Sequence, residues 1–428
     1  MALSTIQQAV HDLANILGVK PLTIGLTAGF VGYLILCSSL RFQRLKSVRR
    51  RYNYPDRESL SRMTNSDARD ILETVSLLEF PLLFDLSLRF ALFKTYANDN
   101  VGNLLYSASD LAKPTQSSKR YDDTAVMYGC MFKFSPGSKE LSQTIGRVNF
   151  LHNPYIKAGK IQNQDLLYVL FESMYEPVHF MRLYEWRELA DVEVAAIAMV
   201  WKYIGEMMEI DYKAELGKDQ WKDGVEFMED VKAWAQKYQD EHLRPSPEIA
   251  RVGQVSMELL LSSYPKFTRS QVSQTLLVLM GERMRWAFGF PEPGVAVTAF
   301  TFSALLIRKL FIRYLCLPRF SPLHLIGDPD PQTGRIQQFR YMKDPWYNPV
   351  TFWSRWGPEA LVQRAFGLSI PGDGGPEMKP EGFLFTEIGP RAKVGKGAEE
   401  TGRLAEVAHT KISPTSCPFS SVSQKIQV

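Results

Sequence analysis

Apolar residues recur every three or four positions through most of the chain, which is the period of an α-helix. Behind a Thr-Asn-Ser start at residues 64–66, for example, the stripe runs through Ile71, Val75, Leu78 and Leu82. Further helices are predicted at 221–242, 248–262, 268–288 and 294–316. Strand-like alternation between turn residues is scarce, and no repeat of 20–50 residues is visible. The pattern predicts an all-α fold.

One stretch near the N-terminus departs from this amphipathic pattern. Residues 21–40 are twenty consecutive residues without a charge, the length that crosses the hydrocarbon core of a bilayer as a helix. Six basic residues follow within 41–51, whereas only Lys20 flanks the other end. The positive-inside bias then predicts a single-pass anchor with residues 1–20 outside or in a lumen and the rest in the cytosol. A cleaved signal peptide would need an earlier basic start and a shorter apolar region.

Two later regions complete the division of the chain. Residues 293–307 form a fifteen-residue run without charge, short for a span, so a core helix is expected there, with a shallow membrane contact as the alternative. From about residue 370 the chain is rich in Gly, Pro, Lys and Ser. The predicted parts are therefore an N-terminal stretch 1–20, an anchor 21–40, a helical domain 41–370 and a poorly packed tail 371–428.

Composition agrees with a globular protein. Hydrophobic residues make up 45% of the 428 residues and charged residues 22%, and the net charge of +4 does not suggest nucleic-acid binding. The four cysteines, at 37, 130, 316 and 417, form no C-x-x-C pair and no disulfide-like framework. This usage fits a reduced body that faces the cytosol.

The helix over residues 139–152 carries an inward histidine. Ser138 can cap it, and Leu141, Ile145, Val148 and His152 follow at spacings of four, three and four, which is one helix face. Because the three aliphatic residues should face the core, the imidazole should face it too. It is either a satisfied core residue or a ligand.

Prolines and polar residues suggest where helices stop. Asn153-Pro154 is expected to end the helix that carries the histidine, because a proline disfavours helical geometry in the residue before it. Pro81 predicts a kink, Pro177 an interruption, and residues 97–118 a break between helices.

The chain lacks local signatures of common enzyme sites. GxGxxG, GxxxxGK[ST], HExxH, His-x-Asp/Glu and GxSxG motifs are all absent. Among the six histidines only His152 and His179 are candidates for an inward position. One histidine cannot build a zinc site, but one suffices as the axial ligand of a haem.

Charged and hydroxyl residues form a second constellation. Arg120, Asp123 and Thr124 share a helix face, where they could bind a haem propionate or orient bound oxygen, or could merely be a polar helix start with a local ion pair. Arg147 could meet a propionate or a surface acid. Arg187, beside Trp186, suits either a core salt bridge or the wall of a cofactor pocket.

An ordered set of short segments resembles a known family. LEFPLLF, FALFKTY, KRYDDT, RVNFLH, YEWRELADVE, WKYIG, TFWSRWGP and PGD occur in this order after the apolar anchor. Together they resemble the endoplasmic-reticulum-bound oxygenases of fungal mycophenolic acid biosynthesis over nearly the whole chain. Over residues 115–210 they also resemble, more distantly, the catalytic domain of bacterial rubber oxygenases (latex clearing protein).

The resemblance implies an all-helical haem b enzyme that cleaves a carbon–carbon double bond of an isoprenoid with O2. In the fungal branch the substrate is a prenylated aromatic secondary-metabolite intermediate, which implies a meroterpenoid pathway and an endoplasmic reticulum membrane with a lumenal N-terminus. His152 matches the proximal ligand of the rubber branch, and Arg120 and Thr124 match its distal motif. Asp123 stands where that motif has a lysine, so it could steer a proton or pair with Arg120 instead.

The expected partners are a prenylated or terpenoid small molecule, O2 and the lipid bilayer, with no nucleic acid. A membrane anchor suits a greasy substrate, because each buried methylene favours the membrane by about 0.8 kcal/mol. Two alternatives stay open at this point. One is a non-haem iron site with ligands from distant helices, and the other is a membrane-tethered helical scaffold without catalysis.

Overall fold

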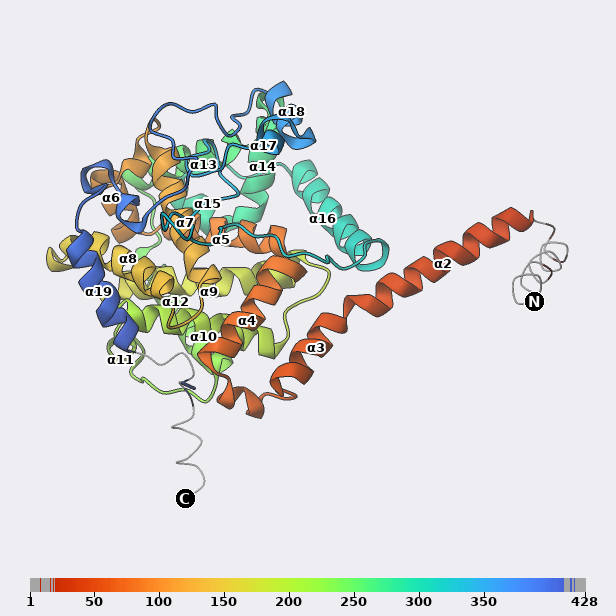
Figure 1. The fold of residues 1–428 in the computed structure, drawn as a ribbon, viewed down its shortest axis with the longest axis horizontal. Helices are drawn as coiled ribbons and strands as arrows, with labels where there is room; N and C mark the ends of the chain where they lie inside the picture. Colours follow the sequence, from red (N-terminus) through yellow and green to blue (C-terminus); the bar gives the residue numbers. More distant parts are fainter. Residues whose placement is uncertain are drawn as a thin grey trace, which may run out of the picture.

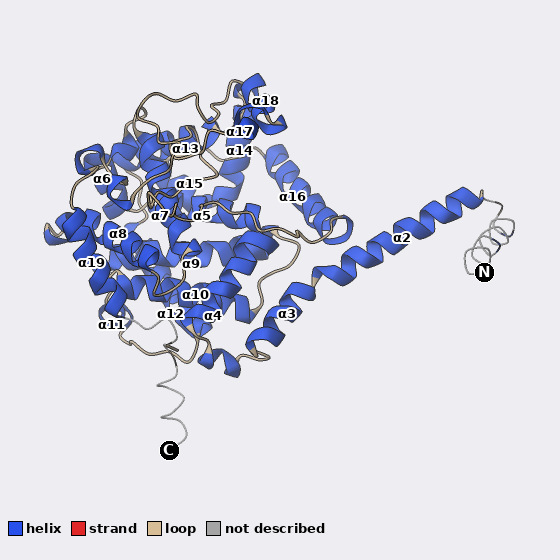
Figure 2. Ribbon diagram, in the orientation of Figure 1, coloured by secondary structure: helices blue, strands red, loops and turns tan. Residues whose placement is uncertain are grey.

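The computed structural model describes residues 20–411 and six separate positions, namely 8, 16, 18, 416, 417 and 419. Among these residues the regular elements are all helices, with no strand and only isolated bridges (Figure 2). The all-α prediction is confirmed. The predicted lumenal stretch 1–20 lies almost wholly outside the described residues.

The elements follow one another in chain order. They are α2 (Pro21–Arg41), α3 (Gln43–Tyr52), η1 (Glu58–Arg62), α4 (Asn65–Glu73), the π-helix η2 (Thr74–Glu79), α5 (Pro81–Thr95), α6 (Asp99–Ala108), η3 (Asp110–Ala112), α7 (Ser117–Lys133), α8 (Lys139–Lys157), α9 (Asn163–Tyr184), α10 (Asp191–Met207), α11 (Tyr212–Leu216), α12 (Gly224–His242), α13 (Pro247–Ser262), η4 (Lys266–Thr268), α14 (Arg269–Met280), α15 (Glu282–Phe288), α16 (Val295–Leu315), α17 (Phe352–Trp356), α18 (Pro358–Ala365), η5 (Phe385–Glu387), η6 (Arg391–Lys393) and α19 (Ala398–Lys411).

Helices α9 and α10 form the centre of the globular body (Figure 1). α10 is apolar on nearly every side, from Val192 to Met207, and therefore packs against α4, α9 and α12 at once. α5 lies along α9 and adds buried aromatic residues such as Phe90, which packs on Phe180 with ring centroids 5.3 Å apart. One continuous core extends from these helices through α7, α8 and α13.

Helix α2 projects away from this body (Figure 1), as expected of an anchor. Two stretches, Pro21–Tyr52 and Val295–Leu315, are long and apolar enough to cross a membrane by length and composition. They meet where α16 ends, because the Tyr33 hydroxyl donates to the Leu315 carbonyl at 2.9 Å and Arg41 donates to the Cys316 carbonyl at 2.6 Å.

The prediction of a core helix at 293–307 is wrong. α16 runs for 21 residues, through Arg308 and Lys309, and only Thr301 on it is buried. Val295 is 87% exposed, Phe300 72% and Ile307 66%. An apolar run in a sequence does not tell whether protein or lipid covers it, and here the protein leaves it uncovered.

Helix breaks also differ from expectation. Pro154 and Pro177 lie inside α8 and α9, each of which continues for at least three residues beyond its proline. A proline inside a helix costs about 3 kcal/mol, which the burial of both halves of α9 offsets. At Pro81 the helix does not kink but restarts, with Pro81 as the first residue of α5. The predicted break at 97–118 contains α6.

Residues 371–411 are packed, contrary to the expected loose tail. Phe383 and Ile388 are buried, and α19 lies along α8. The close approach depends on Gly146, where an added Cβ would lie 2.6 Å from the Thr401 carbonyl oxygen. Composition alone misled here, because a Gly- and Pro-rich segment can pack through its backbone.

Candidate functional site

A large pocket, called here the central pocket, opens between α5, α6, α7, α8, α9, α10 and residues 388–390. It holds about 1580 Å³ of empty space, counted out to its mouth. Its walls are mainly apolar and include Leu92, Tyr96, Val101, Leu104, Leu105, Met127, Tyr128, Met131, Val148, Leu151, Val169, Trp201, Ile204 and Ile388. Such walls favour a large apolar or flat ligand over a small polar one.

His152 lies in the wall of this pocket. Its ring has no capping partner: Nδ1 is sealed from solvent without a hydrogen bond, and no hydrogen bond to Nε2 occurs among the described residues. Burial lowers the pKa of His152 to about 4, and the positive charge of Arg120 adds to this. The imidazole is therefore neutral at pH 7 and has a free lone pair. His179, the other candidate, stacks on Tyr175 in α9 and does not line the pocket.

Arg120 and Thr124 reach the same pocket from α7. The Arg120 guanidinium donates to the Thr124 hydroxyl, which in turn donates to the Arg120 carbonyl at 3.1 Å. The two side chains are thus held as one unit. Together they present a fixed cation to the space that His152 also faces.

Asp123 stands at the pocket edge, but its carboxylate is already engaged. It is 2% exposed and accepts hydrogen bonds from the Tyr347 hydroxyl at 2.6 Å and from the Gly389 amide at 3.1 Å. It pairs with Lys119 at 2.8 Å rather than with Arg120. Its evident task is to hold the segment around Gly389 against α7.

Arg147 does not line the central pocket. Its side chain is fully buried and donates to the carbonyls of Thr386, Ile388, Lys393 and Lys396 at 2.7–2.9 Å. The predicted role in holding a cofactor is not supported by this position. Arg147 acts on the pocket indirectly, because the segment that it holds contributes residues 388–390 to the wall.

Arg187 also lies elsewhere. It forms a two-pronged ion pair with Glu193, at 2.7 and 2.8 Å, and its guanidinium lies over the rings of Phe80 and Trp186. This is a core salt bridge, and the geometry does not support a cofactor-binding role.

The pocket has one wall that the sequence reasoning missed. α6 contributes Val101, Leu104 and Leu105 to this wall. Two signals in the sequence could have revealed the helix, namely the apolar spacing of three and one between these residues and the capping residue Asn98 before them. Tyr96, just before it, is buried, which raises the pKa of its hydroxyl to about 12. Trp201 of α10 adds a buried indole N–H without a hydrogen-bond partner to the wall.

These features fit a haem. A neutral imidazole can serve as its axial ligand, the apolar walls suit the faces of a macrocycle, and Arg120 offers a cation for a propionate. The non-haem alternative requires several ligating side chains close together. In residues 20–411 and the six other described positions, no group of three or more His, Cys, Asp or Glu residues is arranged to hold a metal.

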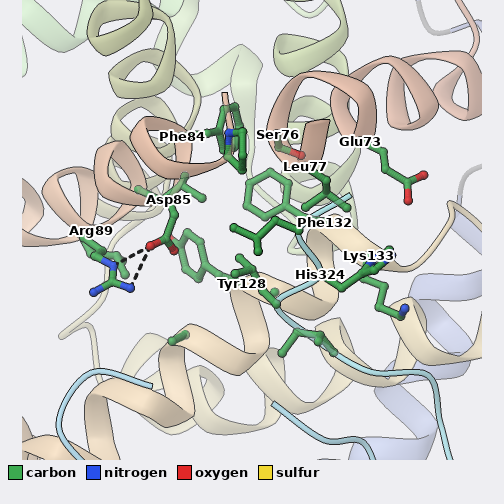
Figure 3. A pocket seen from close by; sticks show the side chains of 18 of the residues that line it. Glu73, Ser76, Leu77, Phe84, Asp85, Arg89, Tyr128, Phe132, Lys133 and His324 are labelled. Carbon is green, nitrogen blue, oxygen red and sulfur yellow. Dashed lines mark hydrogen bonds and ion pairs between the residues drawn. The ribbon is translucent and has the colours of Figure 1, made fainter. Parts of the chain in front are cut away.

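A second hollow, called here the side cavity, is lined by residues of which Figure 3 shows most. It holds about 870 Å³ of empty space counted out to its mouth, between η2, α5, α7 and residues 323–326. Leu92 and Tyr128 line both hollows.

Comparison with known proteins identifies the family of the chain. Residues 87–308 match the family described as "ER-bound oxygenase mpaB/B'/Rubber oxygenase, catalytic domain". The chain is 34% identical to the ER-bound oxygenase mpaB' of Penicillium brevicompactum over 404 residues, which cover 93% of this chain and 94% of the relative. It is 35% identical to the ER-bound oxygenase mpaB of the same species, over 82% of this chain and 84% of the relative. The ER-bound oxygenase mpaB of Penicillium roqueforti (strain FM164) is 35% identical over 61% of this chain and 88% of its own length.

Proposed function

Because the chain belongs to the family of the ER-bound oxygenases mpaB and mpaB' and of the rubber oxygenase catalytic domain, we propose that it is a membrane-attached haem b oxygenase that cleaves a carbon–carbon double bond in a prenyl chain. The chain is an oxygenase, and the family match replaces the scaffold alternative. The observation that carries the haem assignment is the unpartnered and neutral imidazole of His152, whose Nδ1 is sealed from solvent, in a large apolar pocket.

Each polar side chain of the pocket has a task in this proposal. His152 would hold the iron, and the haem, when bound, supplies the chemistry that activates O2. Arg120, fixed by Thr124, presents a positive charge to a propionate or to negative charge that develops near it. The apolar walls bind the prenyl chain and exclude water. Asp123 keeps residues 389–390 in place.

Attachment to the endoplasmic reticulum membrane is part of the proposal. It is supported by α2, by the basic residues that follow it and by the names of the relatives. By the positive-inside rule the N-terminus is lumenal and the globular body cytosolic. The exposed apolar side chains of α16 fit a shallow contact with the same bilayer, beside the point where α2 leaves it.

The test is an absorption spectrum of the full-length protein in detergent. Wild type should show a Soret band and contain one haem per chain, and His152→Ala should lose or shift the band. His179→Ala, on α9 but outside the pocket, should keep it. A folded wild type that stays colourless and free of iron after expression with added haem precursor would overturn the assignment.

A further inference from the structure

The side cavity is apolar in its middle and polar at its ends. Phe84, Tyr128 and Phe132 stand between the Asp85–Arg89 ion pair and the opposite rim, where Glu73 and Lys133 lie (Figure 3). The Asp85–Arg89 contact is 2.8 Å, so that end carries a neutralised pair rather than a free charge. An elongated apolar space of this kind suits a hydrocarbon chain and offers little to a compact polar metabolite.

Only a thin partition separates the side cavity from the central pocket. Leu92 and Tyr128 line both spaces. The Tyr128 hydroxyl is 2.9 Å from the Ser173 hydroxyl, and its ring centroid is 5.5 Å from that of Trp201 in the central pocket. Phe132 of the side cavity also contacts Trp201, at 5.6 Å between ring centroids. Leu92, Tyr128 and the contact between Phe132 and Trp201 therefore lie between the two spaces.

The outer rim of the side cavity is continuous with the two exposed apolar helices. Leu323, on the segment that returns from α16, donates its amide to the Leu77 carbonyl of η2 at 3.0 Å. From the other side Arg44, which follows α2, donates to the Leu78 carbonyl at 3.2 Å and pairs with Glu79 at 3.0 Å. These contacts place η2, which forms one wall of the side cavity, next to the chain segments that follow the two exposed apolar helices.

We propose that the side cavity is a second substrate compartment, which receives the apolar chain of a prenylated substrate from the bilayer, and that Leu92 and Tyr128 form the partition through which this chain reaches the central pocket. The inference rests on the proposed function, since it places the reacting bond beside His152. It adds a length requirement: a chain that fills both spaces binds more tightly than one that fills the central pocket alone.

A filled side cavity should remove this length dependence. Ala125 lines the side cavity but not the central pocket, so Ala125→Leu adds volume on one side of the partition only. Full-length protein in lipid nanodiscs is titrated with radiolabelled farnesol, with its shorter homologue geraniol and with a straight-chain alcohol as long as farnesol. Empty nanodiscs correct for partitioning. Ala125→Ser keeps the position small, and Ala233→Leu places the same side chain on the exposed face of α12.

For Ala125→Leu we expect farnesol binding to weaken about tenfold or more, with geraniol binding within about twofold of wild type; both controls should bind as wild type does. Unchanged farnesol binding by a folded Ala125→Leu protein overturns the inference. If the straight-chain alcohol weakens as much as farnesol, the compartment takes acyl chains and the prenyl assignment falls.

A measurement on wild type does not depend on the variant. A farnesol analogue with a photoreactive group at its hydrocarbon end should label residues of the side cavity, such as Phe84 and Leu88. Labels confined to α6 and α10 would contradict the inference. Neither assay needs turnover, so the two proposals can fail separately. If the protein contains haem but Ala125→Leu leaves farnesol binding unchanged, only the second-compartment inference is refuted. If the protein contains no haem but Ala125→Leu weakens farnesol binding, only the haem assignment is refuted.

Discussion

Arg147→Met tests whether the C-terminal segment closes the central pocket. The guanidinium of Arg147 is fully buried and donates to four backbone carbonyls between Thr386 and Lys396. Methionine keeps much of the volume of the side chain but removes the charge and every donor. The four carbonyls then lose their hydrogen-bond donor in a buried position, where water cannot easily replace it.

The size of the effect follows from these bonds. Hydrogen bonds to a charged group contribute roughly 1.5–3 kcal/mol each, but burying a guanidinium costs several kcal/mol. Breaking such a buried arrangement by removing one partner typically costs about 3–5 kcal/mol. We therefore expect Arg147→Met to lower the free energy of opening for residues 386–396 by about this amount, which corresponds to a loss of at least about a hundredfold in amide protection.

Hydrogen exchange read by mass spectrometry measures this directly, with urea denaturation for the whole body. Because residues 388–390 line the pocket and the Gly389 amide donates to Asp123, ligand retention should fall with the protection. Arg403→Met, on the exposed side of α19, is the matched control and should change neither quantity. If residues 386–396 in Arg147→Met stay protected and the urea midpoint is that of wild type, Arg147 does not hold this segment in place.

Three further predictions concern other groups. The pKa of His152 is about 4 in the folded protein, below its ordinary 6.5, so the unfolded chain binds the proton more readily. The contribution of the neutral imidazole to the free energy of unfolding is therefore lost as the pH falls from 6.5 to 4, and the loss is at most roughly 3 kcal/mol. Urea titrations of unloaded protein across this range should show a flatter profile for His152→Phe, and parallel profiles would contradict the assigned burial. Burial raises the pKa of Asp122 well above its ordinary value, so its penalty grows as the pH rises past the unfolded pKa; Asp122→Asn should raise the melting temperature more at pH 8 than at pH 5, and an equal shift at both values would argue against a neutral carboxyl. An environment-sensitive dye on Phe311→Cys of α16, read above the wild-type background, should be quenched by brominated lipids, whereas an unquenched dye would exclude bilayer contact there.

The helical fold and the inward histidine could be predicted because both are local. His152 shares a helix face with Leu141 and Ile145, both buried, so the spacing of apolar residues alone aims the imidazole at the interior. The same holds for Arg120 and Thr124, which lie one turn apart on one face of α7. Spacing within a helix is visible in the sequence.

Other features depend on partners that the sequence does not mark. Arg147 binds backbone carbonyls, which every residue carries, so no side-chain pattern announces the contact. The exposure of α16 is likewise invisible, because apolar residues look alike whether they face protein or lipid. Pro177 did not break α9, since tertiary packing outweighs a local preference of about 3 kcal/mol.

The order along the chain of the segments that build the central pocket also sets the order in which they are synthesised. Helix α2 is translated first, whereas residues 388–390, which finish the pocket wall, follow about 350 residues later. At ribosomal speeds of roughly 5–20 residues per second the two events are separated by roughly 20–70 s. In the proposed topology the nascent polypeptide is held at the lipid surface by α2 before the wall of the central pocket is complete, and this interval is available for loading an apolar ligand or a prosthetic group from that surface.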